Sequence, residues 1–200
     1  NLRKTLPEKI NQAWDANVID DTWVSAAGLG NVIVDYKGVV DKGLSDVMRR
    51  IENKLKRLDP REPGNTRKRW FLEAALQGNQ AVVMFSGRIA DCCKEQAEQE
   101  KDETRRRELL KLEDICRNVP LNPARTFHEA VQSIYMILLA VHLESNGHAI
   151  SLGRFDQYVY PYYKRDLEEG RITREEALEI VECFFIKCNE LNKLRSWPDT

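Results

Sequence analysis

One histidine on an expected turn is the residue of this 200-residue sequence best placed to do chemistry. The surrounding stretch, Glu144 to Tyr163, reads ESNGHAISLGRFDQYVYPYY. An apolar helical run precedes the turn, and Asn146-Gly147 is typical of a left-handed cap that ends a helix. His148 is therefore expected on a short polar turn, with Ala149 beside it, before paired aromatic residues open the next element.

Two interpretations of His148 follow from this position. The carboxyl end of a helix favours a protonated imidazolium, and the small neighbours Gly147 and Ala149 leave the ring accessible. On the first interpretation, the histidine donates a hydrogen bond to a polar substrate. On the second, it caps the free carbonyl groups of its own helix. The residues alone leave both interpretations open.

Other common catalytic constellations are missing from the sequence. His128 and His142 lie on the preceding predicted helix, but no HxxxH or HExxH spacing joins them into a metal site. No GxSxG segment provides a nucleophile elbow. The stretch GLGN, at positions 28–31, lacks the glycine spacing of a phosphate-binding loop. We therefore expect no metal, and no residue pair stands out as a catalytic acid and base.

Composition indicates an ordinary globular protein without a nucleic-acid or membrane partner. The formal net charge is -1, with 42% hydrophobic and 32% charged residues. The longest apolar run, Ile134 to Val141, is far below the ~20 residues that span a bilayer. No basic and then apolar signal region opens the sequence.

The cysteines favour a reducing, cytoplasmic location. Their number is odd and no pair has CxxC spacing, which argues against a secreted disulfide framework. We expect buried, reduced thiols at most of these positions. The five are Cys92, Cys93, Cys116, Cys183 and Cys188.

The elements that must position the turn are almost all helical. Apolar residues recur at spacings of three and four through most of the chain. Capping boxes are expected at Thr126 with Glu129 and at Thr173 with Glu176. We predict a mainly α chain with little strand. Its elements are a helix to about residue 19 anchored by Trp14, a loop or short extended segment within 26–36, and helices at about 35–58, 66–93, 94–119, 126–146, 153–170 and 173–191.

Two predicted helices carry more apolar surface than one core needs. Residues 74–90 are almost free of charge and include several small residues, so we expect enclosure on several sides. The last helix shows apolar residues on more than one side, including Phe184-Phe185-Ile186. Apolar surface of this kind indicates contact with a partner that this chain does not itself contain.

Long segments of the sequence resemble the glycyl radical enzymes. The stretch from Glu144 to Arg195 is similar to the pyruvate formate-lyase-like branch, which includes glycerol and diol dehydratases, choline lyase and arylacetate decarboxylases. RNVPLNPARTFHEAVQSIYMILLAVHL, at 117–143, and DYKGVVDKGLSDVMRRIENKL, at 35–55, resemble helices of the same family. Together the similar segments cover most of the chain from about Asn31 to Arg195.

The resemblance implies a ten-stranded α/β barrel wrapped in helices, of which residues 1–200 form a helical part of a single domain. Members of the family carry a cysteine loop that forms a thiyl radical and a glycine loop that stores the radical. Neither motif occurs here. The resemblance therefore implies a fragment with no catalytic residue of its own, and we expect the isolated chain to be inactive.

The resemblance also gives roles to three positions. His148 is expected in the wall of the substrate cavity. Several family members have a substrate-contacting serine after this histidine, where this sequence has Ala149. Diol dehydratases tend to have a histidine four residues before the aspartate of the DY segment, where this sequence has Asn31. These two departures put glycerol and propane-1,2-diol in doubt and leave the substrate open, with a larger or more apolar molecule among the candidates.

The complete enzyme would be a radical C–O, C–N or C–C lyase or dehydratase acting on a small polar organic substrate. The family implies a glycyl radical installed by a separate radical-SAM activase, and a homodimer when full length. A different class of function is also open. On that alternative, the chain is a non-catalytic helical scaffold or interaction module derived from the same fold.

Overall fold

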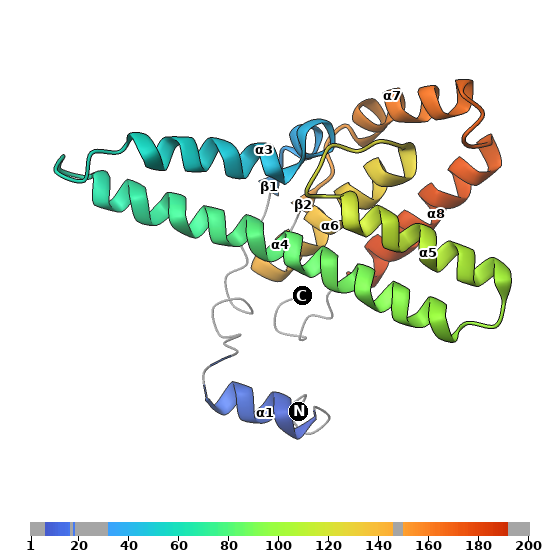
Figure 1. Cartoon of the computed structure of the whole chain (residues 1–200), viewed down its shortest axis with the longest axis horizontal. Helices are drawn as coiled ribbons and strands as arrows, with labels where there is room; N and C mark the ends of the chain where they lie inside the picture. The colour runs from blue at the N-terminus through green and yellow to red at the C-terminus, as the bar shows by residue number, and fades with distance from the viewer. Residues whose placement is uncertain (1–6, 17, 19–31, 146–149, 192–200) are drawn as a thin grey trace, which may run out of the picture.

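The computed structural model describes residues 7–16, 18, 32–145 and 150–191, and its described elements are nearly all helices (Figure 1). The mainly α prediction is confirmed for this part of the chain. In order, the elements are α1 (Glu8–Asp15), β1 (Val32–Ile33), α3 (Tyr36–Arg57), α4 (Asn65–Gln99), α5 (Glu103–Asn118), α6 (Phe127–Ser145), β2 (Ile150–Ser151), α7 (Phe155–Glu168) and α8 (Arg174–Glu190).

The long helix α4 forms one side of the molecule, with α3 packed along its first half and α5 along its second half (Figure 1). The predicted break at DPREPGN is confirmed, because α3 ends at Arg57 and Gly64 adopts a left-handed conformation before α4. The predicted boundary between helices near position 94 is wrong. The helix continues to Gln99, and the next one begins after Asp102, whose side chain accepts from two backbone N–H groups.

A glycine kink in α3 fastens this helix to the connector that precedes α6. Gly43 has φ 74°, and a Cβ there would lie 2.3 Å from the Leu121 carbonyl oxygen. The kink frees the N–H of Leu44, which donates to the Pro120 carbonyl at 2.8 Å. The N–H of Ser45 donates to the Leu121 carbonyl at 2.9 Å. Only glycine combines this backbone conformation with so close an approach.

Helix α6 is the centre of the core. It contacts α3, α4, α5, α7, α8 and β2. Its most buried apolar side chains, Ala130, Ile134 and Met136, are fully shielded from solvent. A helix surrounded on most sides needs apolar residues all round rather than a single stripe, which explains the run IYMILLAV in the sequence.

Polar side chains close the beginning of α6. The Asp166 carboxylate accepts from the backbone N–H of Phe127 at 2.7 Å and from the Arg171 guanidinium at 2.9 Å. The predicted capping box at Thr126 is only half right. Thr126 Oγ1 accepts from the N–H of Glu129 at 3.2 Å, but the Glu129 carboxylate binds the backbone and guanidinium of Arg125 instead. Arg125 provides more donors than the N–H of Thr126, so it takes the carboxylate.

The second predicted capping box is confirmed at the start of α8. Thr173 Oγ1 accepts from the N–H of Glu176 at 3.1 Å, and the Glu176 carboxylate accepts from the N–H of Thr173 at 2.8 Å. None of the described helices combines the length and the apolar character needed to cross a bilayer.

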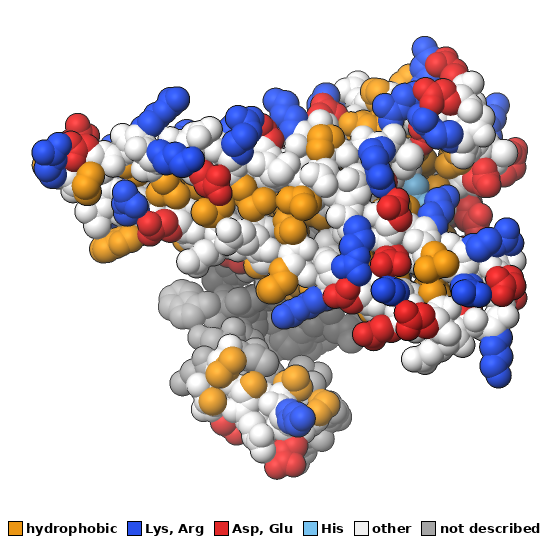
Figure 2. All heavy atoms as spheres, in the orientation of Figure 1, with side chains coloured by type: hydrophobic (Ala, Val, Ile, Leu, Met, Phe, Trp, Pro, Cys, Tyr) orange, Lys and Arg blue, Asp and Glu red, His pale blue; other side chains and the backbone are white. Residues whose placement is uncertain are grey.

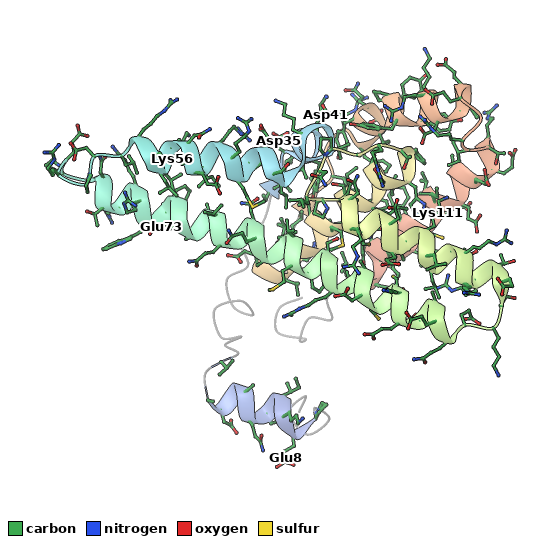
Figure 3. All side chains as sticks on the ribbon, viewed as in Figure 1. Glu8, Asp35, Asp41, Lys56, Glu73 and Lys111 are labelled. Carbon is green, nitrogen blue, oxygen red and sulfur yellow. The ribbon has the colours of Figure 1, made fainter. Side chains whose placement is uncertain are left out.

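The small described sheet consists of β1 and β2, which pair in parallel with Val32 opposite Ile150 and Ile33 opposite Ser151. The extended segment predicted within 26–36 is confirmed at β1. The second strand was not predicted, since residues 146–153 were expected to form only a turn. Figure 3 shows Asp35 and Asp41 at the β1 end of α3, where the chain leaves the sheet.

Candidate functional site

The three predicted site residues, Asn31, His148 and Ala149, lie outside the described residues. The structure does describe the positions that follow them. Val32 comes directly after Asn31 and Ile150 directly after Ala149, and these two residues are partners in the parallel sheet. The described geometry therefore concerns the strand pair and the side chains that hold it.

The strand pair continues into α7 through a tight turn. Gly153 has φ 63°, a conformation that glycine adopts readily. Its N–H donates to Ser151 Oγ at 3.1 Å. A Cβ on Gly153 would lie 3.5 Å from Cγ2 of Ile33, so the turn passes close to β1 as well.

A pair of stacked tyrosines lies at the exit of the strand pair. The Tyr158 hydroxyl on α7 donates to the carbonyl of Leu152, which directly follows β2. Its ring stacks on Tyr36, the first residue of α3, with centroids 6.4 Å apart and planes 21° apart. Burial raises the pKa of Tyr158 to about 12, with a further contribution from Asp156. The hydroxyl therefore remains a proton donor at neutral pH.

Tyr36 contributes a ring but no hydroxyl contact. The residue is almost fully buried, and its hydroxyl has no hydrogen-bond partner among the residues that the structure describes. Burial raises the pKa of Tyr36, and the neighbouring Tyr158 and Cys188 raise it further. A buried polar group without a partner is uncommon, and His128 Nδ1 and Ser133 Oγ on α6 are also buried without a partner among the described residues.

Aromatic side chains continue from the tyrosines to an exposed edge. Phe155 stacks on Phe184 with centroids 5.0 Å apart, and Phe185 packs against Phe155 at 6.3 Å. Phe185 is 53% exposed and Ile186 is 63% exposed, although both are large and apolar. Ile33, whose side chain lies close to Gly153 of the β2–α7 turn, is 67% exposed. We call Ile33, Phe185 and Ile186 the apolar rim.

A second exposed apolar region lies on α4. Trp70 is 64% exposed, Phe71 is 73% exposed and Met84 is 54% exposed. Helices α3, α5 and α6 contact α4, but Met84, within the stretch 74–90 that was expected to be enclosed, is more than half exposed, so this chain encloses that stretch only in part. Figure 2 shows hydrophobic side chains along the seam between α3 and α4, flanked by charged residues.

The described histidines do not form a catalytic or metal-binding group. His142 Nδ1 lies 2.8 Å from the Leu138 carbonyl of its own helix. Burial lowers the pKa of His128 to about 4, with Lys111 lowering it further, so this ring is neutral at pH 7. Within the described ranges, no three His, Cys, Asp or Glu side chains gather as metal ligands.

The described thiols with shifted pKa values are not activated nucleophiles. Burial raises the pKa of Cys93 and of Cys188, and it raises that of Cys116 to about 11. A thiol whose pKa is raised stays protonated and is a poor nucleophile. A cavity of about 100 Å³ beside Cys116, Ser86 and Pro120 is also too small for most substrates.

Comparison with known proteins places the chain in a family. Residues 1–198 match the family Pyruvate formate lyase-like, and the chain belongs to that family. It is 38% identical over 200 residues to an isethionate sulfite-lyase from Nitratidesulfovibrio vulgaris, covering 92% of this chain and 24% of the relative. It is 32% identical over 169 residues to a (2S)-3-sulfopropanediol dehydratase from Klebsiella oxytoca, covering 84% of this chain and 20% of the relative.

Solved structures agree with this assignment. A structure concerning 1,2-propanediol dehydration in Roseburia inulinivorans matches with a TM-score of 0.84 and 38% identity, covering 98% of this chain and 23% of that one. A glycyl radical enzyme from Archaeoglobus fulgidus matches with a TM-score of 0.78 and 39% identity, covering 82% of this chain and 21% of that one. The predicted family and the predicted fold, a helical portion of a glycyl radical enzyme barrel, are confirmed.

The chain spans about a quarter of the length of the relatives that it matches. It therefore corresponds to a segment of such a protein, as the sequence predicted. Sequence reasoning missed β2 and the Tyr36–Tyr158 pair. A β-branched residue, Ile150, between Gly147 and Gly153 was the available signal for a short strand.

Proposed function

We propose that this chain forms part of the substrate-cavity wall of a glycyl radical lyase or dehydratase that acts on a small polar organic substrate. The observation that carries the proposal is the register of the strand pair, with Val32 opposite Ile150. These residues directly follow Asn31 and Ala149, two positions far apart in the sequence that the family resemblance assigns to the substrate. A parallel pair brings the beginnings of its two strands to the same end of the sheet.

The catalytic parts of the proposed enzyme belong to polypeptide outside this chain. The glycyl radical supplies, through a cysteine thiyl, the abstraction of a hydrogen atom from the substrate. We propose that a radical-SAM activase installs the radical, and that the complete enzyme is a cytoplasmic homodimer. Such chemistry needs a cavity closed to water. The contribution of this chain is to close that cavity, and the apolar rim is surface suited to contact the remaining polypeptide.

Within the wall, each proposed site residue has a separate role. His148 donates a hydrogen bond to a hydroxyl or acidic oxygen of the substrate. Ala149 and Asn31 determine which substrates fit, because alanine has no side-chain donor and asparagine replaces a histidine of the diol dehydratases. Isethionate and 3-sulfopropanediol, named for two relatives, are the first candidates to test.

The experiment uses the full-length protein, activated anaerobically, and follows both turnover and the glycyl radical signal by electron paramagnetic resonance. His148→Ala should lower kcat/KM by about tenfold to a hundredfold, because a hydrogen bond to the substrate is lost. The radical signal should keep its intensity, since His148 does not carry the radical. The 200-residue chain treated in the same way should give no signal and no turnover.

Two results would contradict the proposal. A radical doublet from the 200-residue chain alone would show that the chain is a complete radical protein. Unchanged kinetics in the His148→Ala enzyme on every accepted substrate would contradict the role in substrate binding. It would instead support the second interpretation, in which His148 caps the free carbonyl groups of its own helix.

A further inference from the structure

Helix α4 carries an exposed apolar face as well as a buried one. The buried positions include Ser86, Ala90 and Cys93, which recur every three or four residues. The exposed positions recur at the same spacing, so they share a different face of the helix. We call them the outer face of α4: Trp70, Phe71, Ala74, Gln77, Gly78, Ala81 and Met84. A helix that is apolar on more than one side is usually buried on more than one side.

The outer face of α4 has no free carboxylate. Between Glu73 and Asp91 the only charged residue of the helix is Arg88. The two flanking carboxylates are already paired, Glu73 with Arg69 and Asp91 with Arg117 of α5. Any ion pair that the outer face makes must therefore come from its cations.

Two arginines lie at the ends of the outer face. Arg67 lies one turn before Phe71, and Arg88 lies one turn after Met84. Neither guanidinium has an ion-pair partner within the described part of the chain. At a rise of about 1.5 Å per residue, the two arginines are about 30 Å apart along the helix. A complementary partner is therefore an elongated element with apolar side chains in its middle and acidic residues toward both ends.

We propose that the outer face of α4 binds an acidic amphipathic helix from the part of the same protein that lies outside this chain. The chain spans about a quarter of the length of the relatives that it matches, so most of such a protein is available to supply this helix. Its apolar side chains cover Trp70, Phe71 and Met84, and its carboxylates pair with Arg67 and Arg88. This contact is independent of the proposed substrate and radical chemistry.

A second copy of this chain fits the outer face less well. In an antiparallel two-fold pairing with Trp70 of one copy beside Met84 of the other, Arg88 lies opposite Thr66 and therefore next to Arg67. In a parallel two-fold pairing, each arginine meets its own copy. Like charges brought together oppose association, so the free arginines favour a partner of opposite charge over self-pairing.

The first test compares oxidation by hydroxyl radicals in the 200-residue chain and in the purified full-length protein. Trp70 and Met84 should be oxidised at least about tenfold more slowly in the full-length protein, because a packed contact excludes water from them. Cys92, one turn beyond Arg88, is exposed and should react equally in both proteins. Equal oxidation of Trp70 and Met84 in the two proteins would overturn the proposal.

The second test identifies what covers the outer face. Gln77, at its middle, is replaced by the photo-reactive residue benzoylphenylalanine in the full-length protein, and the cross-linked peptide is sequenced by mass spectrometry. The peptide should come from outside the 200 residues and should carry Asp or Glu on both sides of an apolar stretch. A cross-link from position 77 to residues 66–88 would show self-pairing, and a cross-link to a peptide without acidic residues would show a different partner. Either result would overturn the proposal.

The third test concerns the charges alone. Reversing both arginines, with Arg67→Glu and Arg88→Glu, should raise oxidation of Trp70 and Met84 in the full-length protein at least about threefold, because the carboxylates then repel. Lys94→Glu is the control, since Lys94 is an exposed cation of α4 beyond the outer face. An equal effect of the control, or no effect of the double reversal, would contradict an acidic partner.

Discussion

The two ends of the central helix α6 differ in how completely side chains of this chain cover them and satisfy their polar groups. At its beginning lies the closed junction, which we define by Gly43, Phe127, Glu129 and Asp166. The buried carboxylates of Glu129 and Asp166 are each only 2% exposed, and each has several donors. The other end leads toward β2 and the apolar rim, where more than half of each large apolar side chain is exposed.

This difference distinguishes the region whose buried groups find partners within this chain from the region whose apolar surface is left for other polypeptide to cover. Buried charges are tolerated at the closed junction because every one of them is paired and hydrogen-bonded. Beside the apolar rim, the Tyr36 hydroxyl is buried without a partner, and Phe185 and Ile186 have no covering layer among the described residues. The first region pairs its buried carboxylates within the chain, and the second has the character of an interface.

The largest effect is expected from adding one methyl group at the closed junction. Gly43→Ala places a Cβ 2.3 Å from the Leu121 carbonyl oxygen at a backbone φ of 74°. We expect a loss of about 3–5 kcal/mol in the free energy of unfolding, from overlap and backbone strain together. Urea unfolding followed by circular dichroism measures it.

Gly78→Ala is the control for this substitution. Gly78 lies within α4, and nothing lies within 4 Å of a Cβ added there. The change should stabilise the chain by about 0.5–1 kcal/mol, because alanine favours helix more than glycine does. Similar destabilisation by both substitutions would show that the Gly43 contact is not special.

Removing the buried carboxylate of the closed junction should come next in size. Asp166→Ala leaves the Phe127 N–H and the Arg171 guanidinium without their acceptor. We expect a loss of about 3 kcal/mol, the usual cost of leaving buried donors unpaired. Asp156→Ala is the control, because Asp156 pairs with Arg154 on the surface, where both side chains are 68% exposed. Its effect should be much smaller, because an ion pair exposed to solvent contributes little to stability, and equal losses would contradict the distinction.

The free energy of unfolding should depend on pH because of His128, which lies at the start of α6. Its pKa is lowered to about 4 by burial, with Lys111 lowering it and Glu129 partly opposing the shift. The unfolded chain binds the proton first, near pH 6.5, so stability falls as the pH drops from above 6.5 toward 4. The loss due to this group between pH 7 and pH 5 should be about 2 kcal/mol. His128→Gln should remove that part of the slope, and an unchanged slope would count against a neutral buried ring.

The smallest effect is expected beside the apolar rim. Tyr36→Phe removes a hydroxyl that has no partner within the described part of the chain, so stability should be unchanged or rise by up to about 1 kcal/mol. Tyr162→Phe, which removes a hydroxyl bound to Asp41, should instead lose about 1 kcal/mol. A clear loss of stability in the Tyr36→Phe chain would mean that the hydroxyl already has a partner within this chain.

Local patterns in the sequence predicted most of the helices. Apolar spacing and the residues DPREPGN placed α3 and the start of α4, and Thr173 with Glu176 placed the start of α8. The capping box at Thr126 was only half right, because Arg125 and Asn118 compete for the Glu129 carboxylate. Local spacing does not reveal such competition.

Contacts between distant parts of the chain were not predictable in the same way. Strand β2 is too short to have a pattern of its own, and it exists because β1 lies beside it. The Tyr36–Tyr158 pair likewise joins two segments that only the fold brings together. The roles of Asn31 and Ala149 came from the family resemblance, whereas His148 was singled out by its expected turn as well, and all three roles remain predictions.

The most direct test of the central claim is whether the apolar rim is covered in the full-length protein. Cys183 is exposed on α8, near Phe185 and Ile186 in the sequence, and Cys92 is exposed on α4. Alkylation of each thiol, followed by peptide mass spectrometry, compares the two positions without any substitution. In the 200-residue chain both thiols should react. In the full-length protein Cys183 should react at least about tenfold more slowly while Cys92 keeps its rate. Equally fast alkylation of Cys183 in both proteins would contradict the claim that other polypeptide closes this surface.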